Sequence, residues 1–368
     1  MPFCAARCGY CDFNTYTAAE LPGGGDRAGF AATALLEVDH AVAELGPAAR
    51  SAATVFIGGG TPTLLPPEEL VAILDGIRQR LGLEDGAEVT TEANPESVDP
   101  GAFALLRAGG FTRVSIGMQH AAPHVLSVLD RVHTPGRAAA AVAEAHAAGF
   151  EHVSLDLIYG TPGETAEDWA LTLETALAAR PDHVSAYGLE VEPGTALAAR
   201  VRRGELPQPD GDAMADRQAE ADAALSAAGL EWYEVANHAA TSLARCRHNL
   251  GYWHSHDWWG IGPGAHSHVA GERWWNVKHP SVYARRLAAG ESPAAGSEVL
   301  GPAARRFERI MLEVRLAEGL DLELLSPAGR RAAERLERDG AIELTGGRAV
   351  LTLHGRLTAD AVVRDLTD

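Results

Sequence analysis

The chain has 368 residues, 46% of them hydrophobic and 22% charged, which is an ordinary globular composition with room for two domains or one large barrel plus an appendage. Its 50 acidic and 31 basic residues give a formal charge of −19, so we expect the chain to repel nucleic acid and anionic lipid. No stretch approaches 18 consecutive apolar residues, which excludes a membrane-spanning helix, and the first residues lack the basic and apolar regions of a signal peptide. We therefore expect a cytoplasmic protein.

Short β-branched segments alternate with helix-forming segments through the first two thirds of the chain. Strands are predicted at residues 54–57, 89–91, 113–116, 152–158, 183–187 and 231–235. Helices are predicted at residues 67–83, 136–148, 165–179 and 212–228. Because each parallel crossover needs a helix, this order predicts an α/β fold with a parallel sheet, as a barrel or an open barrel.

Glycine and polar residues follow most of the predicted strands closely. They are the segments 58–61, 92–95, 117–119 and 159–163, together with Asp156 and Glu190. The carboxyl ends of parallel strands and the loops after them form the active-site face of such folds. These residues are therefore expected to lie together around one opening of the barrel.

The rest of the chain differs in character. Residues 232–279 hold six of the seven tryptophans and seven of the fifteen histidines. Further on, helices are predicted at 303–316 and 326–339, and two short strands at 341–344 and 349–353 flank the turn 345–347, which suits a small winged-helix-like α+β module. We therefore divide the chain into a barrel (1–230), a Trp/His-rich connector (231–290) and a C-terminal module (291–368).

Three of the four cysteines, Cys4, Cys8 and Cys11, lie within the first eleven residues. Clustered cysteines in a cytosolic chain are metal ligands more often than disulfides. Three thiolates on a [4Fe–4S] cluster leave one iron open, and C-x3-C-x2-C is the spacing of radical S-adenosylmethionine (SAM) enzymes, in which that iron binds SAM. The alternative is a structural zinc site completed by Cys246 or a histidine.

Six segments occur in the order in which one family carries them. They are CAARCGYCDF (4–13), GGGTPT (58–63), EANP (92–95), SIGMQ (115–119), DLIYGTPG (156–163) and HNLGYW (248–253). Over essentially its whole length the chain resembles the radical SAM proteins related to oxygen-independent coproporphyrinogen III oxidase. This resemblance implies a partial (β/α)6 TIM-like barrel, whose first strand is here truncated, followed by the C-terminal module.

The residue two positions after the third cysteine separates two branches of this family. The oxidase branch has a fourth cysteine there, whereas this chain has Phe13. Phenylalanine is typical of the HemW-type haem chaperones, which bind haem and deliver it to haem proteins, respiratory enzymes above all. The resemblance therefore implies a haem chaperone rather than the oxidase, which is the alternative reading, and leaves catalysis uncertain.

The resemblance also implies roles for single residues. Cys4, Cys8 and Cys11 would ligate the [4Fe–4S] cluster. SAM would be contacted by Gly60, Thr61, Glu92, Gln119, Arg131 and Asp156. Carboxylates suit ribose hydroxyls or an ammonium group, and a guanidinium suits the SAM carboxylate.

HNLGYW matches the H-N-x-x-Y-W haem motif of the chaperone branch, which makes His248 the candidate haem ligand, with Tyr252 and Trp253 able to contact the porphyrin. Competing ligands remain, namely His254, His256, His266, His268 and Cys246, of which we expect the thiol to be inert. The partners expected are haem and recipient haem proteins, including membrane respiratory enzymes reached by transient docking. A homodimer is a further candidate.

The family has a Tyr-x-His-x-Pro-Phe strand before the first cysteine, and only Pro2 and Phe3 of it are present here. We therefore expect that the natural protein starts further upstream.

Overall fold

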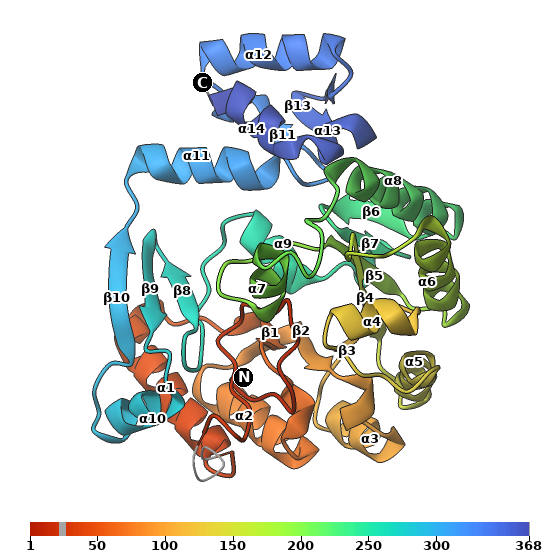
Figure 1. The fold of residues 1–368 in the computed structure, drawn as a ribbon. Coiled ribbons are helices and arrows are strands. Elements are labelled where there is room, and N and C mark those ends of the chain that lie inside the picture. Colours follow the sequence, from red (N-terminus) through yellow and green to blue (C-terminus); the bar gives the residue numbers. More distant parts are fainter. Residues whose placement is uncertain (22–26, 368) are drawn as a thin grey trace.

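A curled, mostly parallel sheet organises the computed structural model, which describes residues 1–21 and 27–367 (Figure 1). Its parallel strands are β1 (Ala52–Ile57), β2 (Leu83–Ala93), β3 (Arg113–Gln119), β4 (His152–Tyr159) and β5 (His183–Gly188). A hairpin of β6 (Glu231–Glu234) and β7 (Asn237–Ala239) extends the sheet antiparallel to β5, giving the order β1-β2-β3-β4-β5-β7-β6. The α/β half-barrel expected from the sequence is confirmed.

Helices cover the outer face of this sheet. They are α1 (Phe30–Leu45), α2 (Pro67–Arg80), α3 (Pro100–Ala108), α4 (Pro123–Val128), α5 (Arg137–Ala147), α6 (Ala166–Ala178) and α8 (Gly211–Ala227), with α7 (Ala196–Arg202) beyond the carboxyl ends of the strands. On α6, the side chain of Thr165 accepts a hydrogen bond from the backbone N–H of Asp168, whose carboxylate accepts one in return, and this capping box fixes where the helix begins.

Alternation along each strand separates the core from the barrel interior. On β3, Val114 and Ile116 are buried in the main hydrophobic core, whereas Ser115 and Gly117 are only partly buried. Neighbouring strands are in register, so that Ser115 lies beside Ser154 of β4. Consequently the outward-facing side chains of each strand pack against the helices, and the inward-facing positions can carry polar side chains.

Several predicted elements differ from the structure. The strand predicted at 89–91 begins earlier, at Leu83. The helix predicted at 67–83 ends at Arg80, because Gly82 adopts a left-handed φ of +88° that terminates it, and Leu83 then starts β2. The segment 231–235 is not a further parallel strand but half of the β6–β7 hairpin, because no helix separates it from β7.

The Trp/His-rich connector contains a second sheet, in the order β10-β9-β8. Its elements are α9 (Arg247–Trp253), β8 (His266–Val269), β9 (Glu272–Asn276) and α10 (Pro280–Ala288), and the sheet is completed by β10 (Ala294–Val299), which lies beyond the predicted connector boundary at residue 290. The sequence predicted none of these strands, since tryptophans and histidines dominate the segment.

The C-terminal module lies at one end of the molecule and has its own hydrophobic core (Figure 1). It comprises α11 (Pro302–Glu313), β11 (Leu320–Asp321), α12 (Pro327–Arg338), β12 (Ile342–Thr345), β13 (Arg348–Leu351), α13 (Leu353–Leu357) and α14 (Ala359–Thr367). The predicted helix–helix–strand–strand order is confirmed. Within the described ranges, no helix is both long and apolar enough to cross a membrane.

Candidate functional site

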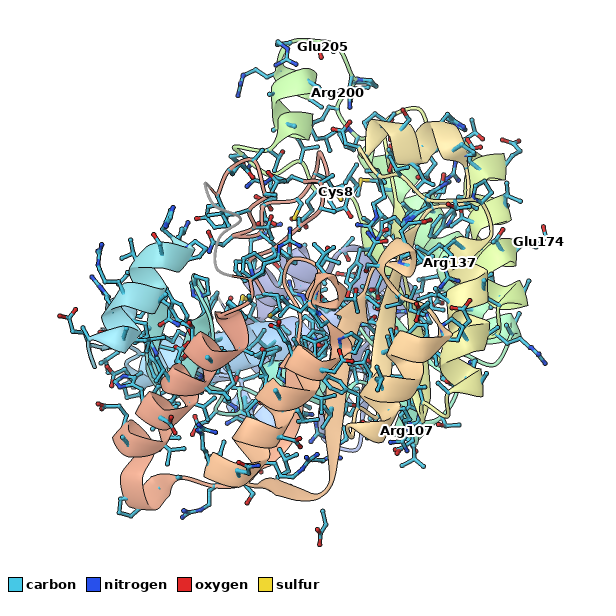
Figure 2. All side chains as sticks on the ribbon, turned by 90° about the horizontal axis from the view of Figure 1, so that it is seen from below. Cys8, Arg107, Arg137, Glu174, Arg200 and Glu205 are labelled. Carbon is cyan, nitrogen blue, oxygen red and sulfur yellow. The ribbon has the colours of Figure 1, made fainter. Side chains whose placement is uncertain are left out.

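The cysteine-bearing loop lies across the carboxyl ends of the strands. Gly9 donates its N–H to Leu129 O at 2.9 Å, and an added Cβ there would lie 2.4 Å from the carboxylate of Asp130, which would have to move. The backbone of residues 1–3 runs beside the glycine segment after β1, where Gly60 N donates to Met1 O and Thr61 N to Phe3 O, both at 2.7 Å. Figure 2 shows Cys8 toward the interior of the molecule, whereas Glu174 and Glu205 project from its periphery.

All three thiols of this loop are free and partly buried, and two of them contact polar side chains. The hydroxyl of Thr61 lies 4.0 Å from Cys4 Sγ, and Nη1 of Arg131 donates to Cys8 Sγ at 3.4 Å. Burial raises the pKa of Cys4 and of Cys11, so both are thiols at neutral pH until a metal binds and deprotonates them. In the described part of the chain, no three His, Cys, Asp or Glu side chains converge on a point suited to a single metal ion.

Two enclosed carboxylates lie below the loop. Glu92 accepts the N–H of Gly59 at 2.9 Å, and Asp156 accepts the hydroxyl of Ser115 at 2.9 and 3.0 Å. Burial, together with the neighbouring charge of Asp156, raises the pKa of Glu92 to about 7, and burial raises that of Asp156 to about 6. Among the described residues neither carboxylate forms a salt bridge, although the Met1 ammonium acts on Glu92 and Arg131 acts on Asp156, so a cationic ligand such as an ammonium or sulfonium group would stabilise the pair further.

Gln119, Arg131 and His133 form one contact group at the same end. Nε of Arg131 donates to His133 Nε2 at 3.1 Å, Nη2 of Arg131 donates to Gly117 O at 3.3 Å, and the side chain of Gln119 lies 3.2 Å from His133 Nε2. Burial and the charge of Arg131 lower the pKa of His133 to about 4, so the imidazole is neutral. The structure thus brings together all the residues predicted to hold SAM and the cluster.

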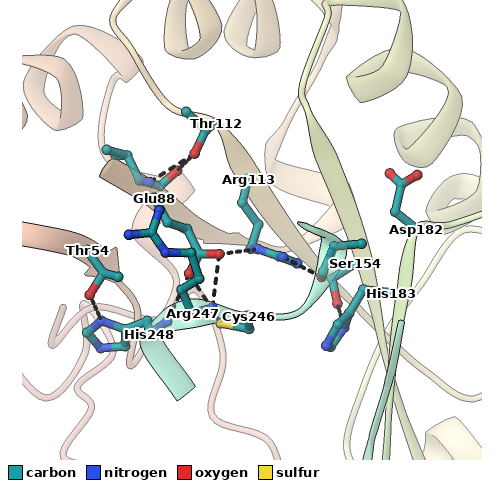
Figure 3. Close-up of polar contacts among 12 residues, drawn as sticks. Thr54, Glu88, Thr112, Arg113, Ser154, Asp182, His183, Cys246, Arg247 and His248 are labelled. Atoms are coloured by element: carbon teal, nitrogen blue, oxygen red, sulfur yellow. Dashed lines mark hydrogen bonds and ion pairs between the residues drawn. The ribbon is translucent and has the colours of Figure 1, made fainter. Parts of the chain in front are cut away.

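His248 does not belong to this group. It lies on α9 and contacts β1 near where the parallel strands begin, at the end of the interior away from the cysteine loop. Figure 3 shows its contact with Thr54. Its Nδ1 lies 2.8 Å from the hydroxyl of Thr54 on β1, and its ring stacks on Phe56 at 5.1 Å. Burial lowers the pKa of His248 to about 4.

A buried carboxylate of β2 anchors α9. Glu88 accepts the backbone N–H of Arg247 at 3.1 Å and that of His248 at 3.0 Å, and Nε of Arg113 donates to it at 3.2 Å. Cys246 Sγ lies 3.6 Å from Glu88, and burial raises the pKa of this thiol to about 12. Glu88 and Glu92 are four residues apart on one strand face, about 13 Å by strand geometry, so β2 contributes to both ends of the interior.

Four polar residues of the interior were not predicted from the sequence, namely Glu88, Arg113, Thr54 and His133. Thr54 and Arg113 lie near the starts of β1 and β3, and Glu88 lies midway along β2 beside Thr54; the period-two pattern directs all three side chains into the barrel. That pattern was available in the sequence, but the contact with residues 246–248 joins segments far apart in the chain. His133 lies two residues after Arg131, and nothing in the sequence places it against Gln119.

The model of the radical SAM superfamily matches residues 1–176. The "Heme chaperone HemW" of Mycobacterium tuberculosis H37Rv is 56% identical over 367 residues, covering 100% of this chain and 93% of that protein. The protein of the same name from Escherichia coli K12 is 37% identical over 73% of this chain and 68% of its own length. The structure of Escherichia coli coproporphyrinogen III oxidase, HemN, superposes with a TM-score of 0.84 at 21% identity, covering 100% of this chain and 88% of that one.

Proposed function

The chain belongs to the HemW family within the radical SAM superfamily, and we propose that it is a haem chaperone that binds haem on α9 and transfers it to haem proteins. The observation that carries this proposal is the placement of the HNLGYW segment. It forms a helix anchored by Glu88 in the barrel floor, and Tyr252 of this helix is 39% exposed, within reach of a bound ligand.

We propose that Cys4, Cys8 and Cys11 hold a [4Fe–4S] cluster. The chemistry of the donors fits this group, since one loop offers three free thiols without a fourth, and Phe13, 56% exposed, occupies the position of the further cysteine. When bound, such a cluster supplies an open iron to SAM and an electron for cleaving it.

The SAM site consists of Gly60, Thr61, Glu92, Gln119, Arg131 and Asp156. Gly60 allows the close approach, because a Cβ there would lie 2.4 Å from Phe3 O. The carboxylates of Glu92 and Asp156 bind hydroxyl or ammonium groups, and Arg131 is placed to pair with a carboxylate while contacting Cys8.

Haem binds at the other end of the interior, through the pair formed by His248 and Tyr252. The recipients are haem proteins, including respiratory enzymes of the membrane, and contact with the membrane is through those partners. The chain consists of three parts, residues 1–230, 231–290 and 291–368. The chaperone acts in the cytoplasm and has the capacity to form a homodimer.

One anaerobic experiment tests this function. The cluster is reconstituted on the full chain, ferric haem is titrated, and 5′-deoxyadenosine is measured with and without coproporphyrinogen III. We expect stable haem binding, transfer of that haem to an apo-cytochrome, and unchanged coproporphyrinogen. Absence of haem binding contradicts the proposal.

The alternative function is oxygen-independent coproporphyrinogen III oxidation. The likeness to HemN shows a shared fold, and at 21% identity it carries nothing about the substrate. Turnover of coproporphyrinogen III in the same assay would establish this alternative.

A further inference from the structure

Both ring nitrogens of His248 are already engaged. Nδ1 lies 2.8 Å from the hydroxyl of Thr54, and Nε2 lies 2.9 Å from the hydroxyl of Tyr252, one helical turn further on. With the ring also stacked on Phe56 at an interplanar angle of 23°, the imidazole is held in place on three sides. An iron atom would have to displace Tyr252 to reach Nε2.

Tyr252 is the member of this pair that faces outward. Its side chain is 39% exposed, and its ring lies edge-to-face against Trp258 with centroids 4.8 Å apart. An incoming porphyrin therefore meets the phenol before it meets the imidazole.

Resting on the proposed function, we infer that the phenol oxygen of Tyr252 is the iron ligand for haem and that His248 is its positioning residue. Tyrosinate is a known axial ligand of ferric haem. When the iron–oxygen bond forms, the O–H bond of Tyr252 breaks and its proton leaves to solvent at the exposed side of the phenol, while the neutral imidazole of His248 donates from Nε2 to the phenolate oxygen and accepts from Thr54 at Nδ1. Iron stays ferric throughout, so no electron donor is involved.

The neighbouring histidines are less well placed for this role. Nε2 of His254 lies 2.8 Å from the carboxylate of Glu318, which occupies it. His268 is only 6% exposed and lies behind Trp258, with ring centroids 5.0 Å apart. His256 and His266 are exposed, and the experiment below distinguishes them from Tyr252.

Ferric haem is titrated into the full chain with its cluster reconstituted, and the complex is studied by absorption and resonance Raman spectroscopy. The variants are Tyr252→Phe and His248→Ala, with Tyr187→Phe as the matched control because Tyr187 is a similarly exposed tyrosine on β5, 42% exposed. Ring-deuterated tyrosine assigns the iron–phenolate bands. Circular dichroism establishes that each variant is folded.

We expect phenolate bands that shift on deuteration in the wild type and in Tyr187→Phe, and their loss in Tyr252→Phe. In His248→Ala these bands persist while haem affinity falls roughly tenfold or more, as when a hydrogen-bond partner of a metal ligand is removed. Wild-type spectra in Tyr252→Phe, or a wild-type complex without phenolate bands, would overturn the assignment of Tyr252 and leave the chaperone function standing. A wild-type chain that binds no haem would overturn both.

Discussion

Arg131 is the side chain that joins the cysteine loop to the strand ends, since it donates to Cys8 Sγ and to Gly117 O. We predict that Arg131→Gln weakens SAM binding roughly ten- to hundredfold, because hydrogen bonds to charged groups contribute about 1.5–3 kcal/mol. The iron content after reconstitution should stay unchanged, because all three thiols remain. Equilibrium dialysis of SAM measures the effect.

Arg137→Gln is the matched control for this prediction. Arg137 is partly buried and pairs with Glu144 at 2.6 Å, away from the cysteines. Equal SAM affinity in wild type and Arg131→Gln would show that the guanidinium does not contact SAM.

Glu37 of α1 is a fully buried carboxylate with a structural role. It accepts hydrogen bonds from Gly262 N and Asn276 Nδ2, both at 2.6 Å, and from the hydroxyl of Tyr283. Burial nevertheless raises its pKa from 4.5 to about 7. Because the folded-state pKa is raised, the stability linked to this group is fully present below pH 4.5 and is lost as the pH rises through about 7.

We therefore predict that the stability advantage of the wild type over Glu37→Gln shrinks between pH 5.5 and pH 8, by about 2 kcal/mol. Urea unfolding at the two pH values, followed by tryptophan fluorescence, measures it. A difference in free energy of unfolding that does not change with pH would show that Glu37 is ionised throughout.

Single residues were predictable where a motif placed them at a strand end. Glu92 and Asp156 follow from the parallel sheet alone, because carboxyl ends share one edge. The ring contacts of His248 did not follow, since a motif names residue types and not which nitrogen is engaged. The contact between Glu88 and residues 246–248 depends on how the chain returns to the barrel floor.

Among the elements, α9 depends on its tertiary anchor. The helix has only seven residues, too few to be stable in isolation, and Cys246 at its N-cap provides no side-chain hydrogen bond. Glu88 accepts the first two backbone N–H groups instead. We predict that Glu88→Ala destabilises the fold by about 3–5 kcal/mol, because it leaves Arg113 buried without its partner. Denaturant unfolding measures this loss.

A double variant separates the ion pair from the anchor. In Glu88→Leu/Arg113→Met the buried charge is gone, so we expect most of the global stability to return. The N–H groups of Arg247 and His248 still lack their acceptor, so their hydrogen exchange should remain fast. Slow exchange there would show that α9 is held by its other contacts.

Elements were predictable where the helical or strand pattern was long and the ends carried a capping residue. The helix α6, with Thr165 and Asp168, was predicted to within one residue at each end. The second sheet was missed because β9 is rich in tryptophan and directly follows the turn at Gly271, and its pairing with β10 spans the helix α10. Such pairing depends on tertiary contacts and not on local pattern.

On the scale of the whole molecule, the C-terminal module contacts both the barrel and the segment just after α9. Backbone contacts join it to the β6–β7 region, where Ala317 N donates to Tyr233 O at 2.9 Å. The contact between His254 and Glu318 connects the segment just after α9 to the module. The module is therefore expected to restrain α9 from outside, as Glu88 does from inside.

The ion pair between Arg356 and Asp222 is the main polar side-chain contact that we assign to this interface. Nη1 of Arg356 lies 2.6 Å from the Asp222 carboxylate, and its guanidinium lies 4.3 Å from the centroid of the Trp232 ring. Although burial opposes it, hydrogen bonds from His238 and Arg356 hold the pKa of Asp222 well below its usual range. The stabilisation is therefore fully present at neutral pH and is lost only as the pH falls below about 4.

We predict that Arg356→Met weakens this interface by about 1–3 kcal/mol at pH 7, because a charge-assisted hydrogen bond to a mostly buried carboxylate is lost. The module should then separate more often, and limited proteolysis in residues 289–301 should become faster. Arg364→Met, at an exposed position of the same module, is the control and should behave as the wild type. If Arg356→Met is cleaved no faster than this control, the backbone contacts around Ala317 are sufficient to hold the module in place. If Arg356→Met is cleaved faster and also binds haem more weakly, the module restrains α9 through His254.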